Sequence, residues 1–184
     1  MRQAVGRLTA ARLLVVGPGL KSGLQIQIND PGQLGSDLVC CAVGALARYE
    51  PPLLVCSMGT ATTMIAIDSR GAVQGGAILP GVKVALDALT QHTAQLPQID
   101  LEQPPKDVIG RNTIDCMKSG VLYGNACTLD GMAARMEETL GQPARRVATG
   151  SYAAAITPYC RVGWTVEQDL VLEGLQRIHA RNAR

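Results

Sequence analysis

The segment from Pro52 to Gly81 reads PLLVCSMGTATTMIAIDSRGAVQGGAILPG and carries the clearest structural signal in the chain. It contains three runs rich in β-favouring residues, separated by turns at Met58–Thr60 and Asp68–Gly71. Short β-favouring runs with glycine-containing turns between them are typical of antiparallel hairpins. The segment therefore predicts a three-stranded antiparallel meander, around which we expect the rest of the fold to be arranged.

The first turn of this predicted meander has a composition that suits phosphate. Gly59 allows the backbone to come close to a ligand. The hydroxyls of Thr60, Thr62 and Thr63, together with the turn amides, suit phosphate oxygens. An ordinary threonine-rich hairpin is the alternative, and these residues alone leave both interpretations open.

Upstream of the meander, the pattern predicts an amphipathic helix over residues 1–11, a buried strand over 13–16 and a half-buried strand over 24–28. A glycine-rich turn over residues 17–23 separates the two strands. It does not match the P-loop motif, because Leu20 stands where that motif needs glycine. It does not match the dinucleotide-binding fingerprint either, because Ser22 stands at the position of its third glycine. We expect a tight turn that presents Lys21 to an acidic group or to solvent.

A helix is predicted over residues 34–48, with Asp37 in its first turn. The helix dipole favours a carboxylate at that place, so Asp37 could serve only to cap the helix. Alternatively, Asp37 lies at a cleft and accepts a proton from a substrate hydroxyl. Both interpretations stay open at this point.

Downstream of the meander, helices and strands alternate, and the small-residue turn Thr149–Ser151 suits a phosphate or a base. Three glycines at 120, 124 and 131 lie within one predicted long helix and suggest close helix packing. The polar, proline-rich loop over residues 95–107 is the longest connection, and we expect it to be a functional edge or a subunit contact. The predicted elements are helices over 82–93, about 113–140 and 169–180, and strands over 146–148 and 162–165, the last holding Trp164.

Composition restricts the class of protein. The chain has 184 residues, of which 47% are hydrophobic and 17% charged, as in a globular protein of one large or two small domains. The net charge is only +2 and aromatic residues make up 3%, which argues against binding to nucleic acid or to an anionic membrane. No apolar run approaches the length of a membrane span, so we expect a soluble, cytoplasmic protein.

The residues that often bind metals do not form a recognisable motif. No pair among the six cysteines has the Cys-x-x-Cys spacing of a zinc or redox site, so we expect reduced, buried thiols. His92 and His179 are isolated in the sequence and are predicted not to be ligands.

Taken in order, the turns resemble those of the type III pantothenate kinase family. The resemblance covers residues 13–177. Each motif is weak alone, but together they form a specific ordered set: Gly17-Pro18-Gly19-x-Lys21-Ser22-Gly23, Gly35-Ser36-Asp37, Gly59-Thr60-Ala61-Thr62-Thr63, Gly75-Gly76-Ala77-Ile78-x-Pro80-Gly81, Leu96-Pro97, Gly110-x-Asn112-Thr113, Ser119-Gly120-x-x-Tyr123-Gly124, Ala148-Thr149-Gly150 and Leu172-Glu173-Gly174-Leu175.

This resemblance implies an α/β fold of the ribonuclease-H-like, actin-like ATPase class, with a mixed sheet, a β-meander and flanking helices. It implies that most of the first domain is absent. The expected division is an N-terminal remnant over 1–32, a second ribonuclease-H-like domain over 33–165, and a C-terminal helix over 166–184 that packs back on the remnant. It also implies a homodimer that phosphorylates pantothenate in coenzyme A biosynthesis, with ATP, Mg²⁺ and a monovalent cation such as potassium or ammonium.

The resemblance also assigns roles to residues. Asp37 matches the carboxylate that activates the pantothenate hydroxyl. The matches on the substrate side are Gly17, Gly19, Lys21 and Ser36; those in the second phosphate-binding turn are Gly59, Thr60, Ala61 and Thr62; those in a nucleotide-side turn are Thr149 and Gly150.

Several positions depart from the family pattern. The N-terminal Asp-x-Gly-Asn-Thr phosphate turn is missing from this sequence. Leu38 stands where the family has a substrate-holding Arg, Ser57 where it has an Asp associated with phosphate and cation binding, and Ser151 where it has a second Gly. Loss of a bidentate Arg and of a positioning loop weakens a phosphotransferase, so we expect the chain alone to be weak or inactive.

Two alternatives to a kinase remain. The first is a non-catalytic, dimeric relative or fragment that acts as a binding or regulatory module and dimerises through the glycine-rich long helix. The second is a serine hydrolase that uses Ser57. The hydrolase is disfavoured because Val55 occupies the first glycine of the Gly-x-Ser-x-Gly nucleophile elbow.

Overall fold

The predicted meander is confirmed and forms the centre of the sheet. In the computed structural model, which describes residues 13–183, β2 (Leu53–Met58), β3 (Ala61–Ile67) and β4 (Ala72–Pro80) pair antiparallel in sequence order. The register places Ser57 opposite Thr63 and Met58 opposite Thr62 across the first turn. The β-branched and small residues of this segment therefore form a regular ladder directly beside the turn that the sequence singles out.

Parallel strands extend the meander on both sides. β1 (Gln25–Ile26) pairs with β4, β5 (Arg145–Thr149) pairs with β2, and β6 (Thr165–Val166) pairs with β5. The described part of the chain thus has one six-stranded mixed sheet in the order β1-β4-β3-β2-β5-β6. Because β2 and β5 are parallel, Ser57 and Thr149 lie side by side at the same edge of the sheet.

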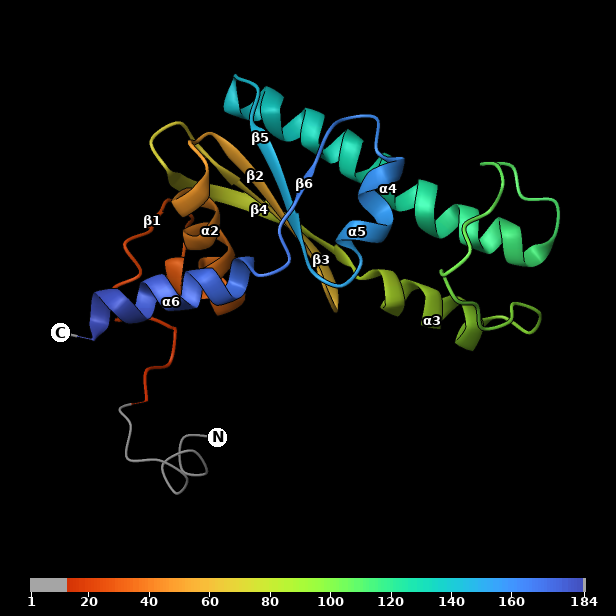
Figure 1. Ribbon diagram of the computed structural model, residues 1–184, viewed down its shortest axis with the longest axis horizontal. Coiled ribbons are helices and arrows are strands. Elements are labelled where there is room, and N and C mark those ends of the chain that lie inside the picture. Colours follow the sequence, from red (N-terminus) through yellow and green to blue (C-terminus); the bar gives the residue numbers. More distant parts are fainter. Residues whose placement is uncertain (1–12, 184) are drawn as a thin grey trace.

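Helices cover both faces of the sheet (Figure 1). α2 and α6 lie against one face, and α3, α4 and α5 lie on the other side. Their bounds, with those of the two short 3-10 turns, are α2 (Ser36–Arg48), α3 (Val82–His92), α4 (Thr113–Leu140), α5 (Ala153–Ile156), α6 (Leu170–Asn182), η1 (Pro31–Gln33) and η2 (Thr157–Tyr159).

Two hydrophobic cores result from this arrangement. Alternate residues of β2 point to opposite faces, so Leu53 and Val55 pack beneath α2 while Leu54 and Cys56 pack towards α4 and α5. All four are fully buried. A strand buried on both faces reads as a continuous apolar run, which is why residues 53–56 are all apolar.

α2 and α6 pack closely through glycine. An added Cβ at Gly44 of α2 would lie 2.4 Å from the carbonyl oxygen of Leu170, and one at Gly174 of α6 would lie 2.0 Å from that of Cys40. At its C-terminal end α6 also holds the 17–23 turn, since Asn182 exchanges hydrogen bonds with the backbone of Lys21 and Arg181 donates to the carbonyl of Ser22 at 2.7 Å. α6 thereby fixes both α2 and this turn.

The predictions for the N-terminal region were partly wrong. The helix predicted over residues 1–11 lies outside the described residues. Residues 13–16 form no strand, and Leu13 and Val15 are exposed. The reason is that the sheet ends at β1 in the described chain, so these residues have no strand with which to pair. The strand predicted over 24–28 shortens to β1, and Trp164 lies just before β6 rather than within it.

Two further expectations from the sequence need correction. The six cysteines are all free, but only Cys40, Cys41 and Cys56 are buried, whereas Cys116 and Cys127 are exposed. The α4 glycines at 120 and 124 have no other atom of the described chain within 4 Å of an added Cβ, so no helix of this chain packs closely on them. None of the helices described is both long and apolar enough to cross a lipid bilayer.

Candidate active site

Asp37 lies at the exposed start of α2. The N-cap residue is Gly35, and no side chain forms a capping hydrogen bond there, so Asp37 does not cap the helix through its carboxylate. An added Cβ at Gly35 would lie 2.6 Å from the Asp37 Oδ1 atom, which shows that the carboxylate turns back over Gly35. A side chain at position 35 would therefore have to displace this carboxylate from its present position.

The Asp37 carboxylate and the first turn of the meander share one cavity. The cavity has a volume of about 710 Å³ and lies between the start of α2 and the sheet. Of the predicted site residues, Asp37, Ser57, Gly59, Thr60 and Ala61 line it. The meander and α2 are separate in sequence, so only the fold could bring the carboxylate and the small-residue turn together.

The turn from Gly59 to Ala61 is shaped by close backbone packing. The amide of Gly59 donates to the carbonyl of Ala61 at 3.0 Å, which closes the turn. An added Cβ at Gly81 would lie 2.2 Å from the carbonyl oxygen of Thr60, so the end of β4 presses against the turn from outside. Thr60 itself is exposed to the cavity side, where its hydroxyl is free to meet a ligand.

Thr62 lies elsewhere. It is only 3% exposed and does not line the shared cavity. The alternation along β3 places it with Met64 towards the α4 face, and its hydroxyl has no hydrogen-bond partner in the described chain. The Thr62 side chain is therefore separated from Asp37 by the sheet, although its neighbour Thr63 lines the cavity.

The Thr149–Gly150 turn adjoins the same edge of the sheet. Gly150 has φ +95°, and an added Cβ there would lie 2.6 Å from the carbonyl oxygen of Met58. Both the left-handed conformation and the close approach to β2 require glycine. Thr149 is 2% exposed and lines neither the shared cavity nor the one beside the 17–23 turn.

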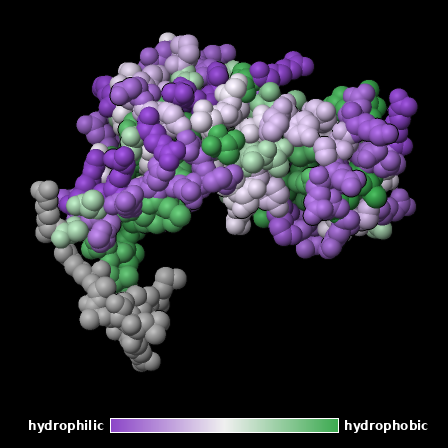
Figure 2. Space-filling model, in the orientation of Figure 1, coloured by the Kyte–Doolittle hydropathy of each residue, from purple (hydrophilic) through white to green (hydrophobic). Residues whose placement is uncertain are grey.

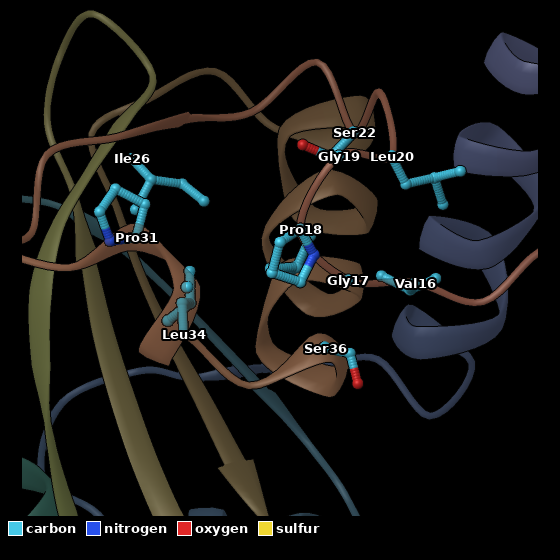
Figure 3. Close-up of a pocket in the computed structure, with 12 residues that line it drawn as sticks. Val16, Gly17, Pro18, Gly19, Leu20, Ser22, Ile26, Pro31, Leu34 and Ser36 are labelled. Carbon is cyan, nitrogen blue, oxygen red and sulfur yellow. The ribbon is translucent and has the colours of Figure 1, made fainter.

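Residues 17–23 form a second, smaller cavity on the other side of the α2 N-terminus (Figure 3). It has a volume of about 310 Å³ and is lined by Gly17, Gly19 and Ser36 among others. Leu34 lines both cavities, so the start of α2 forms the wall between them. Lys21 is exposed and lines neither cavity.

Buried thiols lie behind the shared cavity. Burial, with the nearby charge of Asp37 and the neighbouring Cys40, raises the pKa of the Cys41 thiol to about 12, while a hydrogen bond with Ser57 acts in the opposite direction. Cys41 is therefore a neutral packing group at physiological pH. Ser57 is half-buried, and its hydroxyl contacts this thiol rather than a histidine of the kind that a serine hydrolase needs.

Sequence reasoning missed part of the cavity wall. Ile28, Leu34 and Ile78 line the shared cavity, but the sequence analysis gave them no role. The sequence does carry a signal for the β4 part of the wall. Gly75–Ile78 belongs to one of the motifs that resemble the kinase family, and it consists of small and apolar residues. The contributions of Ile28 and Leu34 depend on how the chain enters α2, which no local pattern shows.

Comparison with known structures supports the fold. A solved chain from Campylobacter jejuni, described as a conserved Baf family transcriptional activator, aligns with a TM-score of 0.65 over 89% of this chain and 71% of its own length, at 20% sequence identity. At that identity the likeness concerns the fold alone. The fold class is confirmed as a mixed α/β sheet with flanking helices, of the actin-like type found in type III pantothenate kinases.

Sequence comparison identifies the family. The sequence model of type III pantothenate kinase matches residues 1–135. Proteins named type III pantothenate kinase from an Exiguobacterium species and from Anaeromyxobacter are 40% and 41% identical over 184 and 169 residues. These alignments cover 100% and 92% of this chain but 72% and 66% of the two relatives.

This chain belongs to the type III pantothenate kinase family. A third relative of that name, from Rubrobacter xylanophilus, is 42% identical and again has 66% of its length covered. The chain thus spans about two thirds of the length of the relatives it matches. Membership supports a pantothenate kinase function, with ATP as the phosphate donor.

Proposed function

We propose that this chain takes part in the ATP-dependent phosphorylation of pantothenate to 4′-phosphopantothenate, the first step of coenzyme A biosynthesis. The observation that carries the proposal is the cavity of about 710 Å³ that Asp37 shares with the turn from Gly59 to Ala61. Phosphoryl transfer needs a proton acceptor and a phosphate-binding turn next to the same reacting atoms. Family membership supplies the identities of donor and acceptor.

In this mechanism Asp37 accepts the proton of the pantothenate hydroxyl. The hydroxyl oxygen forms a bond to the γ-phosphorus of ATP, and the bond from that phosphorus to the β,γ-bridging oxygen breaks. The electron pair leaves with ADP, and the proton stays on Asp37 until solvent removes it. Catalysis of this kind depends on positioning and charge neutralisation rather than on covalent help from the protein.

The turn after β2 binds the transferred phosphoryl group in this proposal. Gly59 and the exposed residue Thr60 line the cavity, where Gly59 lets the backbone come close to the phosphate and the hydroxyl of Thr60 donates to a phosphate oxygen. Ala61 keeps the neighbouring wall small. Thr62 supports the turn from the opposite face of the sheet rather than by direct contact with phosphate.

The smaller cavity suits the rest of the acceptor. Gly17, Gly19 and Ser36 line it directly across the α2 N-terminus from Asp37. The chain of a substrate whose hydroxyl reaches Asp37 extends past Leu34 into this space. Asn182 holds the backbone of Lys21, and Lys21 lines neither cavity. In this proposal Lys21 therefore contacts the substrate only at the entrance of the smaller cavity.

The nucleotide lies towards β5 in this proposal. Thr149 and Gly150 stand at the same sheet edge as Ser57, so the turn after β5 can contact the nucleoside while its phosphates reach Gly59. Because Gly150 has no side chain, the chain after β5 can turn close against the backbone of Met58. This leaves the edge of the sheet beside Ser57 accessible to a ligand.

The residues present are compatible with Mg²⁺ but not with a protein-only metal cage. No group of three or more acidic, cysteine or histidine side chains among the described residues could hold a metal ion. Mg²⁺ in kinases is held largely by substrate phosphates and water, and Asp37, as the proton acceptor, would meet the ion through a bound water rather than as a direct ligand. The ion would neutralise charge on the transferring phosphate.

Ser57 offers a weaker site for a monovalent cation. Its hydroxyl is a neutral oxygen ligand where a carboxylate would add charge. We therefore propose that any potassium or ammonium site at Ser57 fills only at high cation concentration. Substitution Ser57→Asp should lower the potassium concentration that gives half-maximal activity.

A homodimer, a cytoplasmic location and the division of the chain at residues 32 and 165 are parts of the same proposal. The end of the molecule formed by α3, the 93–112 segment and the start of α4 projects from the body and mixes hydrophobic with hydrophilic residues (Figure 2). Val108, Ile109 and Ile114 are exposed there. A light-scattering mass of two chains at micromolar concentration supports the dimer, and a mass of one chain contradicts it.

The experiment is a coupled assay for ADP with pantothenate and ATP, using Asp37→Ala as the control. Removal of a general base lowers turnover by about 10²–10⁴-fold. A pantothenate-dependent rate in the parent chain that falls by this factor in the variant supports the proposal. A parent rate equal to that of Asp37→Ala refutes it.

A second function is favoured by Leu38 and Ser57, which are both uncharged at positions lining the cavity. In this alternative the chain binds pantothenate or nucleotide without transferring phosphate. Calorimetry distinguishes the two: saturable binding of either ligand, with no ADP formed above the Asp37→Ala control, identifies the binding module.

A further inference from the structure

Two cysteines that are far apart in the sequence come together where the segment after α5 packs on α4. Cys127 lies on α4 between Tyr123 and Asp130, about one turn from each, and residues three and four apart share a face of a helix. Cys160 directly follows η2, which contacts α4 together with α5.

Two contacts fix this packing on either side of the cysteines. The rings of Tyr123 and Tyr159 meet edge to face, with their centroids 5.0 Å apart. The carboxylate of Asp130 accepts a hydrogen bond from the backbone amide of Arg161 at 2.8 Å. On both elements the cysteine stands between these two contacts, so the two thiols occupy the middle of the same interface.

The Cys160 thiol lies directly against α4. Its Sγ atom is 3.8 Å from the carbonyl oxygen of Ala126, the residue before Cys127. Burial, with the nearby charges of Asp130 and Cys127, raises the pKa of the Cys160 thiol to about 12. Cys160 is therefore a neutral, half-buried thiol close to Cys127, whereas Cys127 itself is exposed.

We propose that Cys127 and Cys160 are a site of oxidative modification, at which hydrogen peroxide produces a reversible disulfide within the chain. Peroxide oxidises the thiolate of Cys127 to a sulfenic acid, and its O–O bond breaks to release hydroxide. The sulfur of Cys160 then attacks the sulfur of Cys127: the S–S bond forms, the S–O bond breaks, and water leaves with the proton of Cys160. In total the two thiols lose two electrons and two protons, and one peroxide becomes two waters.

Exposure and distance single out this pair among the cysteines of the described chain. Cys56 also lies close enough to Cys160 for their charges to interact, but it is fully buried in β2, where an oxidant does not reach it. Cys116 is exposed, but it lies about three helical turns before Cys127, on the order of 16 Å away, which a disulfide cannot span.

The disulfide ties the segment after β5 to α4. The loop that it closes, residues 127–160, contains β5 and the Thr149–Gly150 turn. A cross-link over a loop of this length restricts the unfolded chain and so stabilises the folded one. We expect oxidation to raise Tm by about 5–10 °C, and dithiothreitol to reverse the change.

Peptide mapping of the oxidised chain tests the proposal. After treatment with hydrogen peroxide, the remaining thiols are blocked with iodoacetamide and the chain is digested with trypsin without reduction. Cleavage places Cys127 in the peptide 119–135 and Cys160 in the peptide 147–161. The expected product is one linked peptide made of these two, which dithiothreitol separates.

Matched serine variants are the controls. Cys127→Ser and Cys160→Ser should each abolish the linked peptide and the rise in Tm, whereas Cys116→Ser should leave both unchanged. Mapping of the parent chain decides the question even where one of these variants fails to fold.

Three results would overturn the proposal. The first is oxidation of Cys127 to a sulfinic acid without any link to Cys160. The second is a link between Cys160 and the peptide 49–70, which holds Cys56. The third is a link between two copies of the peptide 119–135 from different chains. None of these readouts depends on kinase activity, so a negative result here leaves the proposed function unaffected.

Discussion

The contact between α2 and α6 predicts the effect of one methyl group. Gly174→Ala would place a Cβ 2.0 Å from the Cys40 carbonyl oxygen and 2.6 Å from its carbon, whereas ordinary contacts begin near 3.4 Å. The two helices must therefore separate by about 1.4 Å at this point. The obstructing atoms are backbone, so no side chain can rotate away to relieve the clash.

The magnitude follows from two opposing effects. Overpacking of this kind lowers the unfolding free energy by about 1–3 kcal/mol, here towards the upper end. Replacement of glycine by alanine within a helix raises it by about 1 kcal/mol. The net loss of unfolding free energy is about 2 kcal/mol, which for a chain of this size lowers Tm by about 4–8 °C. Because α2 carries Asp37, any kinase activity should fall as well.

Thermal and urea denaturation measure this effect. The matched control is Gln176→Ala, an exposed position on the same helix, which should change stability by less than about 0.5 kcal/mol. Gly44→Ala tests the reciprocal contact, at 2.4 Å from the Leu170 carbonyl oxygen, and should also destabilise. If Gly174→Ala is as stable as Gln176→Ala, the described packing of α6 on α2 is wrong.

Four further predictions concern the site and its supports. Gly150→Ala would place a side chain at φ +95° and against the backbone of Met58. It should lower the unfolding free energy by about 2 kcal/mol or more, measured by denaturation, and weaken nucleotide binding, measured by calorimetry. An unchanged unfolding free energy would contradict the geometry of this turn. The hydrogen bond from Tyr49 and the ion pair with Arg48 lower the pKa of Glu167. The stability that they contribute is therefore present above pH 4.5 and is lost as the pH falls below it. Glu167→Gln should reduce the loss of Tm on acidification, and an unaltered dependence of Tm on acidic pH would refute this linkage. Thiol reagents should label the exposed Cys116 and Cys127 rapidly in the folded chain. Burial raises the pKa of Cys41 and Cys56 to about 12, so these two thiols should react only after unfolding. Mass spectrometry that finds Cys41 or Cys56 among the rapidly labelled sites would contradict their burial. Gly124→Arg should leave the fold intact, since nothing in the described chain lies within 4 Å of an added Cβ, yet convert a dimer to a monomer in light scattering. A dimer unaffected by this charge would exclude the surface of α4 around Gly124 from the interface.

The sequence predicted the centre of the fold better than its N-terminal side. The meander is specified locally, by β-favouring runs and by glycine-containing turns, of which the second places Gly71 at φ +78°. The strand predicted over 13–16 failed because β structure depends on a partner strand, and no local pattern says that the sheet ends at β1. Helices α2 and α4 were predicted well because their starts carry local signals, such as Asn112, whose side chain caps α4 by accepting from Asp115.

The site was predictable in its parts but not in its assembly. Asp37 and Gly59 were both found in the sequence, and the structure places them at one cavity. The side of the sheet to which each threonine points depends on strand register, so Thr60 and Thr63 line the cavity and Thr62 does not. The apolar wall at Ile28 and Leu34 depends on the path of the chain between β1 and α2, which is set by tertiary packing alone.

The most direct measurement is a crystal structure of this chain with pantothenate and a non-hydrolysable ATP analogue. The account predicts that the acceptor hydroxyl lies within about 2.6–3.2 Å of the Asp37 carboxylate. It also predicts that the terminal phosphate contacts the backbone at Gly59 and the hydroxyl of Thr60. A terminal phosphate bound away from this turn, or an acceptor hydroxyl directed away from Asp37, would contradict the assignment of the shared cavity as the site of phosphoryl transfer.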